Sequence, residues 1–377
     1  MTDGGLRKLL RFTRIYGPGR ALFKAAGRLR LTPPVLRPRL GPRDIGLIGC
    51  GQFAFATIGY FLQRRFGRRL LVCHDIEERQ ARSLARALKV PQVAPDVDAL
   101  LATPGLRTVY VASNHATHAE YASRALARGL DAYVEKPVAV SLAQLAVLER
   151  ARRAGPGRLF AGYNRPFAAA LRDLRERLQV DPQGGISMQC FVAGHQLGAD
   201  HWYRRPQEGT RICGNVGHWL DLFVHVAAWR GLPDRLQIAL SWADPGERDD
   251  NMNIAITSDR ADLCSIVLSA RNEPFEGIHE SIQIQHAQAL CQIDDFRQMV
   301  LRQGQQRFSR RYWPKDPGHR RAIMQPFDAE PRRDWAEVEA STLLMLHIAD
   351  MVRAGESASD FTFTQARARL ALALETA

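Results

Sequence analysis

The sequence predicts an α/β protein of two domains, the first with a parallel sheet and the second with a larger, mostly antiparallel one. Three observations carry this prediction. A glycine-rich turn joins a strand to a helix near residue 49, buried strands alternate with helices up to residue 160, and strand-like runs then follow one another. We place a basic extension and linker at residues 1–42, the first domain at 43–160 and an α+β domain at 161–377.

Composition and charge narrow the class of protein. The 377 residues are 46% hydrophobic and 24% charged, which is typical of folded globular domains. The net charge is +13, but residues 1–43 hold eleven Lys or Arg against one acid, Asp3, so about +3 is left for the rest. A body so nearly neutral offers no broad basic surface for a phosphate backbone, and we expect no nucleic-acid partner.

The six cysteines indicate a compartment. They are scattered through apolar runs with no C-x-x-C spacing, which is typical of buried reduced thiols. No run approaches the roughly 18 apolar residues of a membrane span, and no secretory signal is recognisable. We therefore expect a cytoplasmic protein.

Residues 5–31 mix apolar and basic residues at helical spacing, interrupted by Gly17, Pro18 and Gly19. They predict two short basic helices, which either lie on an anionic membrane surface or partner, or clamp onto the body of the protein. A transit peptide is less favoured because serines are absent. Four prolines within residues 32–42 indicate a stiff linker.

The motif G-x-G-x-x-A at residues 49–54 follows an apolar strand at 44–48 and opens a helix. Gly49 permits the tight turn, and Gly51 lets the backbone approach a pyrophosphate held at the positive end of the helix. This context favours a dinucleotide site over an ordinary tight turn. The predicted cofactor contacts here are Gly49, Gly51, Gln52 and Phe53.

Asp75 ends the next strand, at residues 70–74. A carboxylate there can accept both ribose hydroxyls and would repel a 2′-phosphate, which favours NAD, although Arg79 leaves NADP open. The alternative role for Asp75 is a helix N-cap, and the two roles are compatible.

Two further turns follow buried strands. Asn114 and His118 come after the strand at 107–112, where a nicotinamide would lie, although each could instead cap a helix. Glu135 and Lys136 follow the strand at 131–134, and Pro137 cannot continue it. The carboxyl ends of strands form the ligand-binding rim of open α/β sheets, so Glu135 and Lys136 are further candidates, against the alternative of a solvated turn.

These motifs together resemble the Gfo/Idh/MocA oxidoreductases, the glucose-fructose oxidoreductase and inositol dehydrogenase family, over about residues 43–300. The resemblance implies an N-terminal Rossmann domain, an α+β second domain, a nicotinamide cofactor, and substrates that are mostly sugars, cyclitols or sugar nucleotides. The matching residues are Gly49, Gly51, Asp75, Asn114, His118, Glu135, Lys136, Pro137 and those at 162–165.

A glycine-rich loop at residues 209–217 enters a helix that carries His218 near its start, where the positive helix end would keep a histidine neutral. Oxidation of an alcohol needs a base for the hydroxyl proton, and Lys136 and His218 are the two candidates. The resemblance places both in the substrate pocket. Many family members carry an aspartate four residues before this histidine, whereas this chain has Gly214, with Asn215 beside it.

Other residues could extend the pocket. Residues 202–205 join two aromatic side chains to two arginines, a combination that suits stacking and phosphate contacts, although a solvated loop is the alternative. His218, Asp221 and His225 share a helix face, but without a further ligand cluster we expect no metal. The substrate-binding candidates are Lys136, Asn164, Arg165, Trp202, Asn215 and His218.

The second domain shows recurrent strand patterns. The run at 263–268 is apolar on both faces, so we expect helices on one side of its sheet and a second subunit over part of the other. Two helices, at 335–354 and 361–376, should close the domain. The predicted strands are 186–192, 236–242, 252–257, 263–268, 281–286 and 289–293.

The hypothesis that follows is an NAD-dependent dehydrogenase or reductase acting on a hydroxyl or keto carbon of a sugar or sugar nucleotide, in surface polysaccharide biosynthesis. The rival hypothesis is a dinucleotide-binding sensor or scaffold without turnover, tethered by its basic N-terminus.

Overall fold

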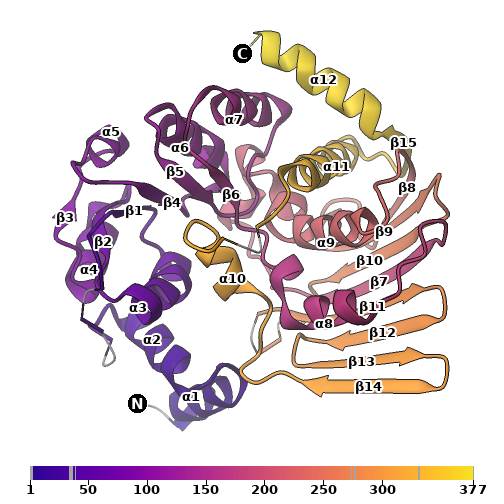
Figure 1. Ribbon diagram of the computed structural model, residues 1–377, viewed down its shortest axis with the longest axis horizontal. Helices are drawn as coiled ribbons and strands as arrows, with labels where there is room; N and C mark the ends of the chain where they lie inside the picture. Colours follow the sequence, from indigo (N-terminus) through magenta and orange to yellow (C-terminus); the bar gives the residue numbers. More distant parts are fainter. Residues whose placement is uncertain are drawn as a thin grey trace. The chain divides into compact units, whose positions relative to one another are not determined.

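The computed structural model divides the chain into two compact units (Figure 1). The first unit comprises Met1–Ala139, Gln144–Gly162 and His319–Arg332, and the second comprises Val140–Ala143, Tyr163–Gly318 and Arg333–Ala377. The structure describes residues 3–33, 37, 38, 40–272, 274, 275, 277–329 and 332–376. Part of the proline-rich linker, at residues 34–36 and 39, therefore lies outside the described residues.

The first unit is built on a six-stranded parallel sheet with the order β3-β2-β1-β4-β5-β6. All residues of β1 and β4 are buried, as expected for strands covered on both faces. The order reverses between β1 and β4, and ligands of such sheets bind outside the carboxyl ends of the strands at this point. The strands are β1 Ile45–Ile48, β2 Leu70–His74, β3 Gln92–Val93, β4 Thr108–Val111, β5 Asp131–Val134 and β6 Leu159–Ala161.

Helices alternate with these strands, which confirms the predicted Rossmann organisation. Helix α10 comes from a segment that the sequence interpretation had assigned to the second domain. It joins this unit because the hydroxyl of Tyr110 donates to the carbonyl of Ile323, and Gln325 donates to that of Ala161 at 2.9 Å. The helices are the π-helix η1 Ala54–Gly59, α3 Tyr60–Phe66, α4 Glu78–Leu88, α5 Val97–Leu101, α6 His115–Ala127, α7 Leu142–Ala154 and α10 His319–Met324.

The basic extension forms two helices, α1 Asp3–Tyr16 and α2 Pro18–Leu29, as its spacing predicted. Of the two arrangements left open, α2 adopts the clamped one, because it packs against η1. Phe23 is 2% exposed and belongs to the apolar core of the unit, with its ring 5.7 Å from that of Phe55 and 5.4 Å from that of Tyr60.

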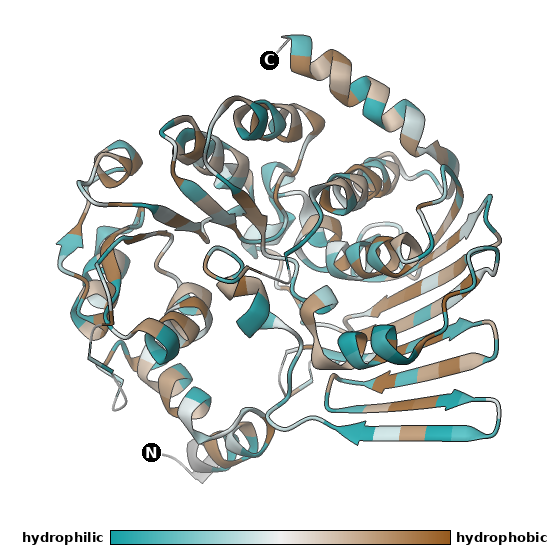
Figure 2. Cartoon of the chain, in the orientation of Figure 1, coloured by the Kyte–Doolittle hydropathy of each residue, from teal (hydrophilic) through white to brown (hydrophobic). Residues whose placement is uncertain are grey.

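The second unit is built on a nine-stranded sheet with the order β14-β13-β12-β11-β7-β10-β9-β8-β15. Its pairs are antiparallel except β7 with β10, so the predicted mostly antiparallel sheet is confirmed. The edge strand β14 is largely exposed and hydrophilic (Figure 2), which discourages pairing with other chains. The strands are β7 Ile186–Ala193, β8 Arg235–Trp242, β9 Asn251–Ser258, β10 Leu263–Ser269, β11 His279–His286, β12 Ala289–Asp294, β13 Gln298–Gln303, β14 Gln306–Arg311 and β15 Ala358–Thr362.

Three of these strands escaped the sequence interpretation. The segments of β13 and β14 are rich in Gln and Arg, which masks a strand pattern. The last helix was predicted from residue 361, but residues 358–362 form β15 because they pair with β8 and Phe361 is buried. The helices of this unit are α8 Ala169–Arg177, α9 Gly217–Ala228, α11 Trp335–Ala354 and α12 Phe363–Thr376.

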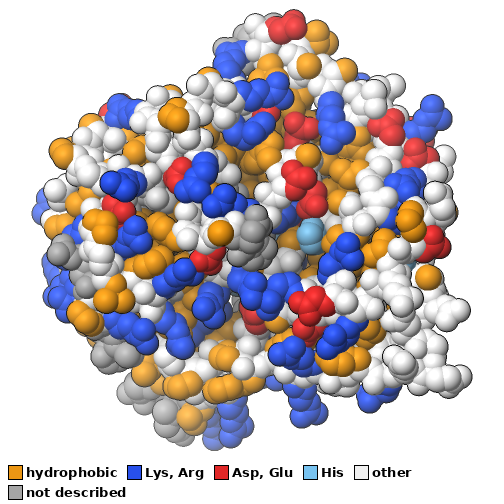
Figure 3. Space-filling model, viewed as in Figure 1, with side chains coloured by type: hydrophobic (Ala, Val, Ile, Leu, Met, Phe, Trp, Pro, Cys, Tyr) orange, Lys and Arg blue, Asp and Glu red, His pale blue; other side chains and the backbone are white. Residues whose placement is uncertain are grey.

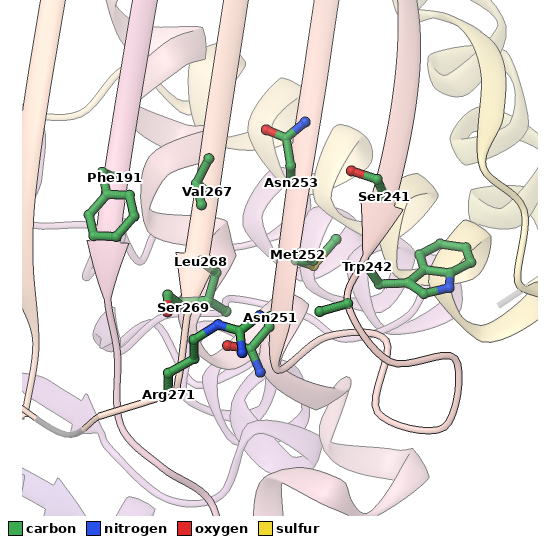
Figure 4. A pocket seen from close by; sticks show the side chains of 11 residues that line it. Phe191, Ser241, Trp242, Asn251, Met252, Asn253, Val267, Leu268, Ser269 and Arg271 are labelled. Carbon is green, nitrogen blue, oxygen red and sulfur yellow. The ribbon is translucent and has the colours of Figure 1, made fainter.

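One face of the nine-stranded sheet is buried and the other is partly open. Burial alternates along β7, β8 and β11, and helices α8 and α9 contact the sheet. The open face holds a hollow of about 510 Å³ lined in part by Phe191, Trp242 and Val267 (Figure 4). Phe191 is 48% exposed, and coverage of this face by a second subunit remains a prediction.

The surface in Figure 3 shows Lys and Arg side chains interspersed with acidic and neutral ones. Within the described residues, no helix is long and apolar enough to cross a membrane.

Candidate active site

The glycine-rich turn has the form that a pyrophosphate requires. Gly49 has a φ of +89°, and a Cβ there would lie 2.4 Å from the carbonyl oxygen of Ala112, so no larger residue fits. A Cβ at Gly51 would meet nothing within 4 Å, so space is open above its backbone. The helix starts at once, with the N–H of Phe55 donated to the carbonyl of Gly51 at 3.0 Å. The N–H groups of a first helical turn are the usual donors to a bound anion.

The two residues that follow Gly51 have different surroundings. The side chain of Gln52 is directed to helix α2, where its Nε2 donates to the carbonyl of Lys24 at 3.2 Å. The side chain of Phe53 is 39% exposed and lies 5.8 Å from the ring of His319. Any contact of Gln52 with a dinucleotide would therefore use its backbone N–H.

Asp75 lies at the end of β2 beside the glycine turn. Its Oδ2 accepts the N–H of Cys50 at 2.6 Å, and its Oδ1 accepts the N–H of Glu77 at 2.9 Å. Helix α4 has Glu77 as its N-cap residue, so the N-cap alternative for Asp75 is wrong: its carboxylate closes the turn before the helix. It is half-buried at the place where a ribose is expected.

Asn114 and His118 differ in what they can contact. Asn114 is exposed at the N-cap position of α6, and among the described residues its side chain makes no capping hydrogen bond. His118 is 1% exposed, with Nδ1 2.8 Å from the carbonyl of Pro137 and Nε2 3.0 Å from that of Ser113. Burial lowers the pKa of His118 to about 4. His118 thus joins the turns after β4 and β5.

Glu135 and Lys136 follow β5 directly. Glu135 is 8% exposed, and its Oε1 accepts a hydrogen bond from the hydroxyl of Tyr133 at 3.0 Å. Burial raises the pKa of Glu135 to about 7, against the lowering effects of Lys136 and Tyr133. Lys136 is half-buried and precedes a cis peptide bond to Pro137.

His218 belongs to the second unit and lies in a helix that is already under way. Residues 210 and 211 are helical, the π-helix η5 Ile212–Val216 follows, and α9 continues to Ala228. The macrodipole acts mainly in the first turn, so the predicted effect of a free helix end on His218 does not apply. The ring is 8% exposed and lies edge-on to those of Tyr163, at 6.4 Å, and Trp219, at 6.0 Å.

Asn215 and Gly214 lie in η5, three and four residues before His218. Asn215 is 5% exposed, and its Oδ1 is a buried acceptor with no hydrogen-bond partner among the described residues. A Cβ at Gly214 would lie 2.4 Å from Cε2 and 2.9 Å from Cζ of Tyr203. The ring of Tyr203 therefore fills the space that a side chain at position 214 would need.

Asn164 and Arg165, predicted to bind substrate, have partners inside the second unit. Arg165 is 5% exposed and makes a bidentate ion pair with Glu280, at 2.8 and 3.0 Å, which also accepts from Trp219 at 2.8 Å. Asn164 is 2% exposed and donates to the carbonyl of Pro317 at 2.6 Å. Both side chains are therefore engaged by other residues of the second unit, and substrate binding by either remains a prediction.

The loop at residues 202–205 is held by its own contacts. Trp202 is half-buried with its ring 4.4 Å from that of Tyr203. Arg204 is paired with Glu247 and with Asp250, the latter at 2.9 Å, whereas Arg205 is exposed.

The face of α9 considered for zinc is occupied by protein partners. Arg333 pairs with both carboxylate oxygens of Asp221, at 2.6 and 3.0 Å, and His225 lies 2.8 Å from Glu337.

The predicted residues thus form two groups. The first unit brings together the turns that carry Gly49, Gly51, Asp75, Asn114, His118, Glu135 and Lys136, all at the carboxyl edge of its sheet. The second unit brings Asn215 and His218 onto one helix. Sequence reasoning missed the packing of Tyr203 against Gly214, although the absence of a side chain at position 214 was an available signal. It also missed the contacts that Arg30 makes with Cys50 and Gln80.

Residues 43–163 match the family described as "Oxidoreductase family, NAD-binding Rossmann fold". Over 190 residues the chain is 30% identical to inositol 2-dehydrogenase of Acidothermus cellulolyticus, a match that covers 47% of this chain and 51% of that one. The chain spans about half the length of the curated relatives it matches.

Solved structures share the fold over more of the chain. A dehydrogenase from Chromobacterium violaceum superposes with a TM-score of 0.69 at 20% identity, covering 84% of this chain and 96% of that one. The WlbA dehydrogenase of Bordetella pertussis, solved with NADH and UDP-GlcNAcA, has a TM-score of 0.65 at 17% identity and covers 86% and 99%. At these identities the likeness shows the fold.

Proposed function

Residues 43–163 belong to the Gfo/Idh/MocA family of NAD-binding oxidoreductases, and from this premise we propose that the chain is an NAD-dependent dehydrogenase or reductase of sugars or sugar nucleotides. The reaction moves a hydride between a hydroxyl or keto carbon and the nicotinamide. The observation that carries the proposal is the turn of Glu135 and Lys136 at the carboxyl end of β5, in the same unit as a glycine turn that fits a dinucleotide.

The cofactor side of the proposal rests on the shape and donors of the glycine turn. Open space above Gly51, the close approach at Gly49 and the N–H groups of the first helical turn suit a pyrophosphate. Asp75 offers a carboxylate for ribose hydroxyls, which favours NAD over NADP. Exposed Asn114 would contact the nicotinamide half. When bound, the nicotinamide supplies the hydride acceptor or donor.

The substrate side rests on three groups suited to a polyhydroxylated molecule. Lys136 in the first unit can donate to, or accept a proton from, the reacting hydroxyl, and His218 in the second unit is the alternative acceptor of that proton. The Oδ1 of Asn215, which has no hydrogen-bond partner in the described part of the chain, is an acceptor whose burial is costly unless a ligand hydroxyl or water satisfies it. Asn215 also lies in a π-helical segment, and such segments are frequent at functional sites.

In the oxidative direction the hydroxyl proton leaves to Lys136 or His218, while the carbinol hydrogen leaves with its electron pair as a hydride that a bound nicotinamide would accept, and the carbinol becomes a ketone. In reduction the same group returns the proton to the forming alkoxide. Glu135, whose pKa is raised to about 7, stays close to the lysine and can balance its charge.

The test is turnover of NADH with a panel of keto-sugars and sugar nucleotides. We expect Lys136→Ala and His218→Ala each to lower kcat by about 10²–10⁴-fold, while NADH binding by His218→Ala is unchanged. Rates equal to wild type in both variants would refute the assignment. An absence of turnover across the panel, with NADH bound tightly, would favour the rival hypothesis of a sensor or scaffold.

The remaining expectations extend this proposal. The NADH and UDP-GlcNAcA complex of the Bordetella pertussis neighbour supports a sugar nucleotide as substrate, and hence surface polysaccharide synthesis as the setting. Six buried free cysteines favour the cytoplasm. We propose a homo-oligomer formed over the partly open face that carries Phe191, and light scattering of wild type and Phe191→Asp tests it. An unchanged mass in the variant would argue against that face.

A further inference from the structure

Arg30, the C-cap residue of helix α2, reaches the glycine-rich turn. Its Nη1 donates to the carbonyl oxygen of Cys50 at 2.9 Å, and its Nη2 donates to the side-chain oxygen of Gln80 at the start of α4. Cys50 stands between Gly49 and Gly51, and its N–H is donated to Asp75. Arg30 therefore holds the backbone carbonyl of Cys50, and Asp75 holds its N–H.

The backbone at Arg30 makes this placement specific. The residue has φ 54° and ψ 35°, a left-handed helix end that glycine adopts most easily. An arginine side chain is thus held at a position where its backbone is disfavoured. A glycine at this helix end would have the easier backbone conformation, but it could not make the contacts to Cys50 and Gln80 that the guanidinium makes.

Helix α2 lies close against the turn along its last two turns. A Cβ at Gly27 would lie 2.8 Å from the ring of Phe55 and 3.2 Å from the side-chain amide of Gln52. Gln52 in turn donates to the carbonyl of Lys24. The extension therefore supports the residues on both sides of Gly51, from Cys50 to Phe55.

The chain next to Asp75 offers a surface that suits an adenosine. Ile76 follows Asp75 and is 93% exposed, the most exposed of the large apolar side chains in the described part of the chain. An isoleucine so exposed next to a ribose-binding carboxylate offers an apolar surface to a planar base. Arg30 is half-buried and adds a positive charge to the same edge.

We propose that the N-terminal extension is a working part of the dinucleotide site, in which Arg30 is a positioning residue for the adenosine half. Arg30 fixes the backbone of Cys50, so that the N–H groups and open space around Gly51 are in place before the cofactor binds. Ile76 supplies the face for adenine. This inference rests on dinucleotide binding and not on the identity of the oxidised substrate.

The test is binding of NADH and of ADP-ribose to the full chain, measured by fluorescence and calorimetry. Arg30→Ala should weaken both by about tenfold, because a charge-assisted hydrogen bond to the turn is lost. Arg30→Lys, which keeps the charge, should recover part of the affinity. The matched control is Arg28→Ala, which removes an exposed arginine of the same helix and should leave both affinities unchanged.

Gln80→Ala removes the second partner of Arg30 at an exposed position and should weaken ADP-ribose by about threefold in the same direction. It also keeps the test valid if Arg30→Ala is poorly folded, which circular dichroism and the melting temperature report. ADP-ribose affinity within twofold of wild type in both Arg30→Ala and Gln80→Ala would overturn the proposal. An equal loss in Arg28→Ala would also overturn it, because net charge alone would then explain the effect.

Discussion

His118 predicts a definite dependence of stability on pH. It is buried between two carbonyl oxygens, and its pKa is lowered to about 4 from an ordinary 6.5, chiefly because burial penalises the charged ring. Above pH 6.5 the ring is neutral in both the folded and the unfolded chain. Between pH 6.5 and 4 only the unfolded chain takes up a proton there, so stability falls as the pH falls.

The magnitude follows from the size of the shift. A pKa lowered from 6.5 to about 4, at about 1.4 kcal/mol for each pH unit, makes the full effect about 3 kcal/mol. His118→Gln removes the titrating ring. The difference in free energy of unfolding between wild type and His118→Gln should therefore change by about 3 kcal/mol in favour of the variant between pH 6.5 and 4.

Tryptophan fluorescence is unsuited to this measurement, because all six tryptophans belong to the second unit. Hydrogen exchange of peptides from β4 and β5, corrected for the intrinsic rate at each pH, reports the unit that contains His118. Glu135→Gln is the matched control. The pKa of Glu135 is raised to about 7, so the stability of the wild type falls as the pH rises from 4.5 to 7. Glu135→Gln has no such titration, and its free energy of unfolding should increase relative to wild type over that range. Parallel curves for wild type and His118→Gln would refute the reasoning.

Three further predictions concern packing. If α2 is part of the core, Phe23→Ala should lower the free energy of unfolding, measured by hydrogen exchange, by about 3–5 kcal/mol. Leu22 is 41% exposed, so Leu22→Ala should lower it by under about 1 kcal/mol. Equal effects of the two variants would contradict a core role for α2. Gly214→Ala should displace Tyr203 and lower kcat with NADH affinity unchanged, so an unaltered rate would argue against that contact. Arg333→Met leaves a buried carboxylate on α9 unpaired and should cost about 3–5 kcal/mol in urea unfolding followed by tryptophan fluorescence, and a loss under about 1 kcal/mol would contradict the pairing.

The parts of the fold that were predicted from the sequence depend on local pattern. The strand, glycine turn and helix around Gly49 and the turn after β5 involve neighbouring residues whose roles follow from backbone conformation alone. The six predicted strands of the second sheet alternate or are richly apolar. Strand β14 is mostly polar because it is an exposed edge, so its hydrogen bonds to β13, and not its composition, define it.

The parts that were missed depend on contacts between distant residues. Arg165 is an ordinary surface candidate until Glu280, 115 positions away, makes it a buried ion pair. The state of His218 depends on where its helix begins, and residues rich in glycine hid the helical start at residue 210. The sequence shows that position 214 has no side chain, but the ring of Tyr203 that fills the space beside it comes from another segment.

Lys136 is held from both sides by groups that are themselves buried. The N–H of Glu135 donates to the carbonyl of Val111 at 2.9 Å, and its side chain is held by Tyr133. On the other side, the carbonyl of Pro137 contacts the ring of His118. Fixing the backbone on either side of Lys136 sets the point from which its side chain extends, and correct placement of the reacting group is one condition for efficient proton transfer. The buried histidine and glutamate would therefore influence catalysis without contacting the substrate, by fixing the backbone from which Lys136 extends.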